Sequence, residues 1–245
     1  MFPSKEDIER FYDAPLGRAA QRLLTERLTA LWPSLAGERC LALGEAERVL
    51  SALAPGTSAI AAAHVRAPDI APMTLRGSGN TRLVVDLLRL PFQDQCFSRA
   101  VLLHTLEDVE NAHRMLREVW RVMEPEGRLL VIASNRRGLW SRTEHTPFGH
   151  GRPYTRRQLS QLLEESLFQP AAWSHALFVP PIPWRIVAGT ASAWEKAGET
   201  FWPALGGVVM VEAIKRLAIP PGNRAPVTAP RAVGAVAANG NVNRD

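Results

Sequence analysis

Cysteine is scarce in this sequence: the 245 residues include only Cys40 and Cys96, which lie far apart in apolar stretches. That scarcity excludes a disulfide-stabilised scaffold and a cysteine-rich zinc site. An apolar run long enough to span a membrane is also lacking, because four prolines interrupt the longest uncharged stretch, residues 167–184. The first residues contain no apolar segment of the kind found in signal peptides. We therefore expect a cytoplasmic protein with no membrane partner.

The positive charge of the chain is local. The net charge is +5, and residues 220–245 carry +2 of it. A second excess lies in one window, where six arginines face only Glu144; they are Arg136, Arg137, Arg142, Arg152, Arg156 and Arg157. A groove for nucleic acid adds interleaved aromatic residues, and Trp140, Phe148 and Tyr154 are few for that purpose. We therefore do not expect a nucleic-acid partner, and the arginines indicate an anion site or a solvated basic face.

Short apolar runs alternate with helical patterns along the chain. Five runs have the length and composition of strands that helices cover on both faces: Arg39–Leu43, Ser58–Val65, Thr81–Val85, Arg99–Leu103 and Arg128–Ala133. Helical periodicity follows Ser4, Leu16, Asn111 and Thr155. Two later runs, Trp173–Val179 and Gly207–Ile214, can pair antiparallel at one edge. The sequence therefore predicts an α/β fold, a doubly wound, mostly parallel, seven-stranded sheet with helices on both faces.

Composition divides the chain into three parts. Residues 1–36 are expected to form N-terminal helices and residues 37–219 the α/β domain. Residues 220–245 contain no aromatic residue, leucine or isoleucine. Such a segment buries too little apolar surface to offset the entropy of ordering, so we expect a disordered tail.

The residues that follow each strand are the ones to examine, because ligands of a doubly wound sheet bind at the carboxyl ends of its strands. Leu43-Gly44-Glu45 ends the first run, and Asp86 follows the third with the spacing Asp86…Leu90-Pro91-Phe92. His104 follows the fourth run, and Leu116–Leu130 joins a helix to the fifth. This succession resembles the class I S-adenosylmethionine-dependent methyltransferases of type 11, by motif over about 39–135 and by topology to residue 215.

The resemblance implies a Rossmann-like methyltransferase fold, S-adenosylmethionine as cofactor, and a set of cofactor-binding residues. In it, Asp86 contacts the adenine amino group and His104 lines the methyl-transfer pocket. The full set is Leu43, Gly44, Glu45, His64, Asp86, Leu87 and His104. The glycine loop departs from the family pattern, since Ala42 replaces an acidic residue and Ala46 and Arg48 stand where glycines are usual. Because a non-glycine residue at positive φ costs about 1–2 kcal/mol, we expect this loop to take another course. His64 stands where the family holds the ribose with a carboxylate.

The acceptor side is expected after the fifth strand. Asn135, Arg136, Arg137 and His145 are the candidate substrate-binding residues, and arginine suits a phosphate or carboxylate partner. Methyl transfer needs alignment in a dry pocket more than a fixed catalytic dyad, so the sequence names no catalytic residue. Glu107 and Asp108 are interpreted as a solvated helix start, with a general base as the less favoured alternative. No metal site is expected.

Two functions remain open at this point. The first is a methyltransferase acting on a polar or anionic acceptor, either a small molecule or a protein. The second is a non-catalytic protein of the same fold that binds or regulates a protein partner. The altered glycine loop favours the second; Asp86 and the ends of the fourth and fifth strands favour the first.

Overall fold

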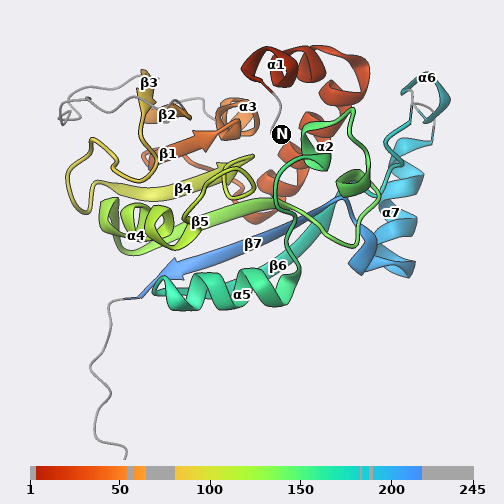
Figure 1. The fold of residues 1–245 in the computed structure, drawn as a ribbon. Helices are drawn as coiled ribbons and strands as arrows, with labels where there is room; N and C mark the ends of the chain where they lie inside the picture. The colour runs from red at the N-terminus through yellow and green to blue at the C-terminus, as the bar shows by residue number, and fades with distance from the viewer. Residues whose placement is uncertain (1–3, 54–57, 65–80, 183, 188–189, 217–245) are drawn as a thin grey trace, which may run out of the picture.

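A single sheet organises the computed structural model, which describes residues 4–53, 58–64, 81–182, 184–187 and 190–216 (Figure 1). The sheet has seven strands in the order β3-β2-β1-β4-β5-β7-β6. Their bounds are β1 Arg39–Gly44, β2 Ser58–His64, β3 Thr81–Val85, β4 Phe97–Leu103, β5 Met123–Ser134, β6 Phe168–Ala176 and β7 Val208–Lys215. Neighbours from β3 to β5 pair in parallel, and β7 pairs antiparallel with both β5 and β6. The predicted fold class is confirmed, including the antiparallel edge strand.

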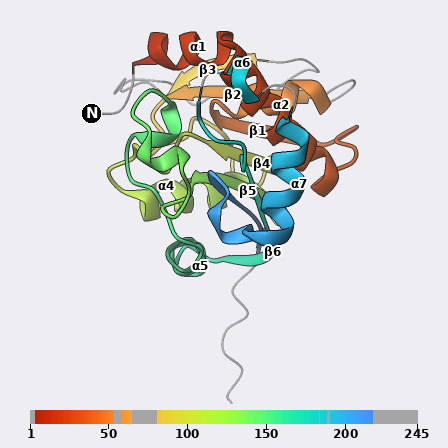
Figure 2. The ribbon, with the colours of Figure 1, turned by 90° about the vertical axis from the view of Figure 1, so that its right-hand side faces the viewer.

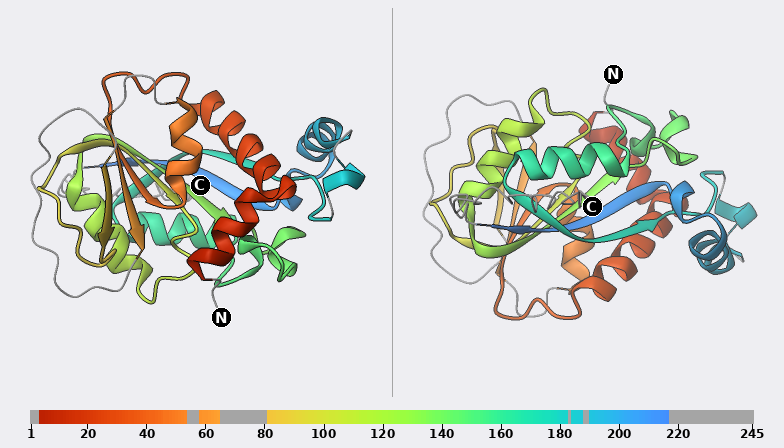
Figure 3. Two further views of the ribbon diagram at one scale, coloured as in Figure 1. Left: turned by 90° about the horizontal axis from the view of Figure 1, so that it is seen from above. Right: turned by 90° about the horizontal axis from the view of Figure 1, so that it is seen from below.

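Helices cover both faces of the sheet because alternate strand residues point to opposite sides. Their bounds are α1 Lys5–Asp13, α2 Pro15–Leu31, α3 Ala46–Leu50, α4 Ala112–Val122, α5 Arg156–Glu165, α6 Trp184–Val187 and α7 Ala191–Phe201. Leu41 and Leu43 of β1 pack with α4 and α5 in one buried cluster. Cys40 and Ala42 pack with α2 and α3 in the other. Figure 3 shows these two layers from above and from below.

Local sequence signals set the starts of two helices. Ser4 and Asp7 form a reciprocal capping box before α1, and Thr155 and Gln158 form another before α5. Each box satisfies main-chain N–H groups that have no partner within the helix. Short 3-10 turns at Trp140–Arg142, Pro147–Gly149 and Pro203–Leu205 lie in the long connections.

The strand β6 begins earlier than the sequence predicts. It starts at Phe168 and not at Trp173, and its pairing with β7 shifts register between Pro170 and Ala172. Proline is tolerated there because β6 is the edge strand, where a missing N–H breaks no second ladder.

The division of the chain at residues 36 and 219 stays a prediction, and the expected tail lies outside the described residues. In the described part of the chain, none of the helices combines the length and apolarity needed to cross a membrane.

Candidate active site

The carboxyl ends of the parallel strands form one edge of the sheet, and three segments far apart in sequence gather there. Helix α1 lies at this edge, as do the loop after β5 and the excursion between β6 and β7 (Figure 1). The excursion belongs there because β7 starts opposite the end of β5, with Val208 paired to Ser134. Buried polar side chains at this edge therefore form the candidate site.

Gly44 makes the turn after β1. Its φ of 66° is left-handed, and a Cβ there would lie 2.2 Å from the carbonyl oxygen of Leu103 and 2.8 Å from Thr105 Oγ1. The main-chain N–H of Glu45 donates to that same carbonyl at 3.0 Å. Ala46 and Arg48 lie within α3, so neither needs a positive φ. A single glycine therefore makes the turn, and the expected departure of the loop from the family's course stays a prediction.

Arg48 reaches from α3 toward α1. Its Nε donates to Glu45 Oε2 at 2.5 Å, and its guanidinium lies 4.8 Å from the ring centroid of Tyr12. Tyr12 is buried, and burial raises the pKa of its hydroxyl well above the usual value. Arg48, which stands where the family usually has a glycine, therefore holds α1 against the edge of the sheet.

His104 lies at the centre of this contact. Its Nε2 shares a hydrogen bond of 2.8 Å with the Tyr12 hydroxyl, and its ring lies 4.5 Å from that of Phe148. Burial, with a smaller contribution from the charge of Arg48, lowers the pKa of His104 to about 3. The residue has a left-handed φ of 54°, which is uncommon outside glycine and typical of constrained functional positions. Its Nδ1 is buried without a hydrogen-bond partner among the described residues.

Glu107 is the functional candidate that the sequence analysis did not favour. The structure buries it three residues after His104, where Oε1 accepts the main-chain N–H of Ser134 at 2.7 Å. Burial raises the pKa of its carboxyl group. Oε2 is buried with no hydrogen-bond partner in the described part of the chain. The interpretation as a solvated helix start was wrong for Glu107; its position just beyond a fully apolar strand end was the available signal.

Asp86 and Leu87 differ in burial. Asp86 is exposed, and its Oδ1 accepts the N–H of Leu88 at 2.8 Å while its carbonyl accepts the N–H of Arg89 at 3.0 Å. Leu87 lies in the core, as do Leu90 and Phe92. The turn therefore presents the Asp86 carboxylate to solvent at the carboxyl end of β3.

The side chain of Asn135 makes its hydrogen bonds within the protein. Its Nδ2 donates to the carbonyls of Ala204 and Gly206 at 2.9 and 2.7 Å, and its Oδ1 accepts the N–H of Arg137 at 3.1 Å. It therefore braces the loop after β5 against the segment that precedes β7. A role in substrate binding stays a prediction for it.

The remaining predicted residues lie apart from the buried pair. Arg136, Arg137 and His145 are exposed, and the guanidinium of Arg136 donates to the carbonyl of Pro153. The backbone of His64 pairs with Val85 at the carboxyl end of β2, and its side chain lies outside what the structure describes. None of these residues contacts His104 or Glu107 through a hydrogen bond between described atoms.

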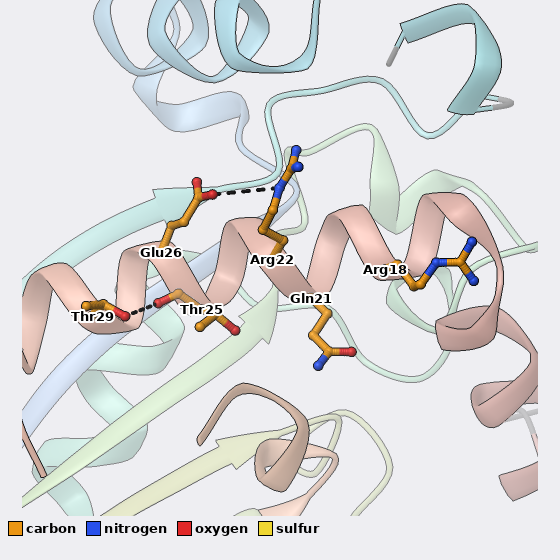
Figure 4. Close-up of a pocket in the computed structure, with 6 residues that line it drawn as sticks. All are labelled: Arg18, Gln21, Arg22, Thr25, Glu26 and Thr29. Carbon is orange, nitrogen blue, oxygen red and sulfur yellow. Dashed lines mark hydrogen bonds and ion pairs between the residues drawn. The ribbon is translucent and has the colours of Figure 1, made fainter. Parts of the chain in front are cut away.

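A separate hollow of about 600 Å³ lies on the outer face of α2 (Figure 4). It is lined by Arg18, Gln21, Arg22, Thr25, Glu26 and Thr29. Arg22 pairs with Glu26 at 3.7 Å, and Gln21 Nε2 donates to the carbonyl of Arg48. Its polar groups are thus used within the chain, and no predicted site residue contributes to its described lining.

The donor groups at the strand ends fit the cofactor that the sequence implies. An exposed carboxylate at Asp86 suits an amino group, and the Gly44 turn brings main chain close to the ends of β1 and β4. The unpartnered Nδ1 of His104 offers a further polar atom at this edge.

Comparison with known proteins gives the family of this domain. Residues 41–131, which run from β1 into β5, match the family model described as a methyltransferase domain. This segment is therefore similar to a methyltransferase domain. The matched region contains Gly44, Asp86, His104 and Glu107, so the resemblance predicted from the sequence is confirmed. No curated protein matches the chain.

Several solved structures with this fold are described as methyltransferases, at low sequence identity to this chain. One is a chain of the complex between the Haloferax volcanii Trm112 methyltransferase activator and a methyltransferase: 15% identity, TM-score 0.61, covering 88% of this chain and 100% of that one. Another is an S-adenosylmethionine-dependent methyltransferase from Thermotoga maritima. It has 17% sequence identity and a TM-score of 0.58, and the match covers 86% of this chain and 96% of that one. A third is geranyl diphosphate C-methyltransferase from Streptomyces coelicolor, bound to S-adenosyl-L-homocysteine. It has 15% sequence identity and a TM-score of 0.53, and the match covers 78% of this chain and 76% of that one. The second depends on S-adenosylmethionine and the third is bound to its demethylated product, in agreement with the predicted cofactor.

The hydrogen bond between Tyr12 and His104 is expected to stabilise the methyltransferase domain measurably. Tyr12→Phe leaves the ring in place and removes the partner of a buried nitrogen, which costs about 1–3 kcal/mol. Urea unfolding measures this loss. In the His104→Asn background the same substitution is expected to cost less, because the partner is already gone. Equal costs in the two backgrounds would show that the two side chains are not coupled.

Proposed function

We propose that this methyltransferase domain is an active S-adenosylmethionine-dependent enzyme and that its acceptor is polar or anionic. One observation carries the proposal. His104 and Glu107, three residues apart in sequence, are both buried at the carboxyl edge, and each has a polar atom that no described residue satisfies. Buried polar groups without partners are uncommon in folded proteins and call for an explanation, and an acceptor with N–H or O–H groups supplies one.

Asp86 is the residue proposed to hold the adenine amino group, with its carboxylate as hydrogen-bond acceptor. The main chain at Gly44 and Glu45 is proposed to approach the methionine end. S-adenosylmethionine, when bound, supplies a methyl group on a positively charged sulfur. The residues of the chain then have to align the acceptor and keep water away from it.

Glu107 is proposed to take the proton of the acceptor. The pKa of its carboxyl group is raised toward neutral pH, and a general base works best when its pKa lies near the working pH. His104 has a pKa of about 3, so it is neutral at physiological pH and orients the acceptor by hydrogen bonding. The Tyr12 hydroxyl fixes the ring of His104 from the other side.

Calorimetry with S-adenosylmethionine, and with its demethylated product, tests the proposal. Asp86→Ala is expected to weaken binding about ten- to a hundredfold, because a shielded hydrogen bond to a charged group contributes about 1.5–3 kcal/mol. Asp86→Asn is expected to be milder, since its amide oxygen still accepts. Glu144→Ala removes an exposed carboxylate from another loop and serves as the control. Binding that Asp86→Ala leaves unchanged would contradict the assigned role.

A second function is favoured by the altered turn after β1. A methyltransferase fold without activity can act as a binding or regulatory subunit, since fold alone does not determine function. The Haloferax volcanii structure is a complex of a methyltransferase with an activator protein. Absence of any heat or thermal shift with millimolar cofactor would favour this function over the enzyme.

A further inference from the structure

Exposed large apolar side chains are confined to one region. Within the described part of the chain, every exposed large hydrophobic residue lies in the excursion between β6 and β7 or at Leu139. They are Leu139, Ile182, Ile186, Trp194, Phe201, Trp202 and Leu205. Phe201 is 69% exposed and Ile186 is 65% exposed. Single exposed apolar residues are common, but such a concentration marks an interaction surface. We call these seven residues the apolar tip.

Helix α7 presents part of the tip from a firmly attached position. Its Ala191, Glu195 and Gly198 are buried, and Glu195 Oε1 accepts the main-chain N–H groups of Phe178 and Val179 at 2.7 and 3.1 Å. Trp194 and Phe201 are exposed and lie seven residues apart, two helical turns along one side. The outward aromatic residues thus come from the solvent side of a helix whose other side is packed.

The loop after β5 adds arginines beside the end of the excursion that follows this helix. Gly138 approaches Gly206 so closely that a Cβ would lie 2.5 Å from its carbonyl oxygen, which places Leu139 next to the end of the excursion. Arg136, Arg137 and Arg142 of this loop are exposed. The loop that carries these arginines therefore borders the end of the apolar tip.

The geometry points to an anionic membrane surface as the occupant: we propose that the apolar tip inserts into the headgroup region while the arginines bind acidic lipids. Figures 1 and 3 show α6 and α7 at one side of the molecule, beyond the body of the sheet, and Figure 2 faces that side; a projecting shape suits a flat surface. Tryptophan favours the membrane–water interface, and arginine is attracted to acidic headgroups. This differs from the expectation of no membrane partner, which considered only segments that span a bilayer.

Other occupants fit less well. A second copy of the chain would bring like-charged arginines together. The residues after Arg216 follow β7, whose end pairs with Phe168, the first residue of β6, far along the strands from the tip. From residue 220 these carry three arginines against one aspartate. An acidic protein remains as the competing occupant that the experiment has to separate.

Co-sedimentation of the full chain with vesicles tests the proposal, comparing phosphatidylcholine alone with phosphatidylcholine plus phosphatidylserine. Binding is expected only with phosphatidylserine and is expected to weaken at high salt. Phe201→Ser with Trp202→Ser is expected to weaken partitioning at least tenfold, because two large apolar side chains no longer insert. Arg136→Ala and Arg137→Ala are each expected to weaken it about fivefold.

Arg114→Ala is the matched charge control, since Arg114 is exposed on α4, away from the tip. Both serine substitutions are at exposed positions, and unchanged thermal unfolding would confirm that the variant folds. Failure to bind phosphatidylserine vesicles at low salt overturns the proposal. Retention on polyglutamate without vesicle binding assigns the surface to an acidic protein, and dimerisation that the serine variant loses assigns it to a second copy; either result also overturns it.

Discussion

Gly44→Ala is expected to destabilise the fold by about 2–5 kcal/mol. The left-handed φ of 66° accounts for about 1–2 kcal/mol of this. The rest comes from contact, because the new Cβ would lie 2.2 Å from the backbone oxygen of Leu103, which belongs to a buried strand and cannot move aside as a side chain can. In a chain of this length, we expect a fall of about 5–15 °C in the midpoint of thermal unfolding.

Gly37→Ala is the matched control for this substitution. Gly37 also has a left-handed φ, of 78°, but a Cβ there meets nothing within 4 Å. Its cost is expected to stay near the conformational 1–2 kcal/mol. A cost for Gly44→Ala no larger than that for Gly37→Ala would show that the ends of β1 and β4 are not held in close contact. The larger cost would show that this glycine is required by the packing of the chain itself, whether or not a cofactor binds.

The fold was predictable from the sequence because its signals are local. Thr81–Val85 was predicted to the residue, and the helix after Ser4 begins with the capping box that Ser4 and Asp7 suggest. Strand β6 was predicted to start five residues too late, since Pro170 masks a strand that only an edge position tolerates. Edge position depends on the pairing of β7, which no local pattern contains.

The site was predictable only as an edge of the sheet. The predicted ends of the strands correctly placed Gly44, Asp86 and His104 at this edge of the sheet. The use of each side chain depends on partners distant in sequence: Asn135 is taken by carbonyls about 70 residues away, at Ala204 and Gly206. Glu107 is buried because the N–H of Ser134 and the following loop cover it. Such contacts arise from packing, and a sequence pattern does not specify them.

Acidification below pH 6.5 is expected to destabilise this protein through His104. The native pKa of His104 is about 3, below the ordinary value of 6.5. Between pH 6.5 and 3, His104 is therefore protonated in the unfolded chain but not in the native state. The free energy of unfolding is highest above pH 6.5 and falls as the pH drops toward 3. One such group lowers the free energy of unfolding by about 1.4 kcal/mol per pH unit. Unfolding by urea at a series of pH values from 7 to about 4.5 measures this slope.

His104→Asn isolates the contribution, since asparagine accepts a left-handed φ and does not titrate. At pH 7 the variant is expected to be less stable than the wild type, because Tyr12 loses its partner. The difference is expected to shrink by about 1.4 kcal/mol for each pH unit below 6.5. Glu107 opposes the trend: its pKa is raised, so the native state binds that proton first and gains stability as the pH falls through this range. His175, whose pKa burial lowers, acts in the same direction as His104 but is present in both proteins. Parallel stability curves for the two proteins would mean that His104 takes up its proton at the same pH in the folded and unfolded states, which would contradict the lowered native pKa.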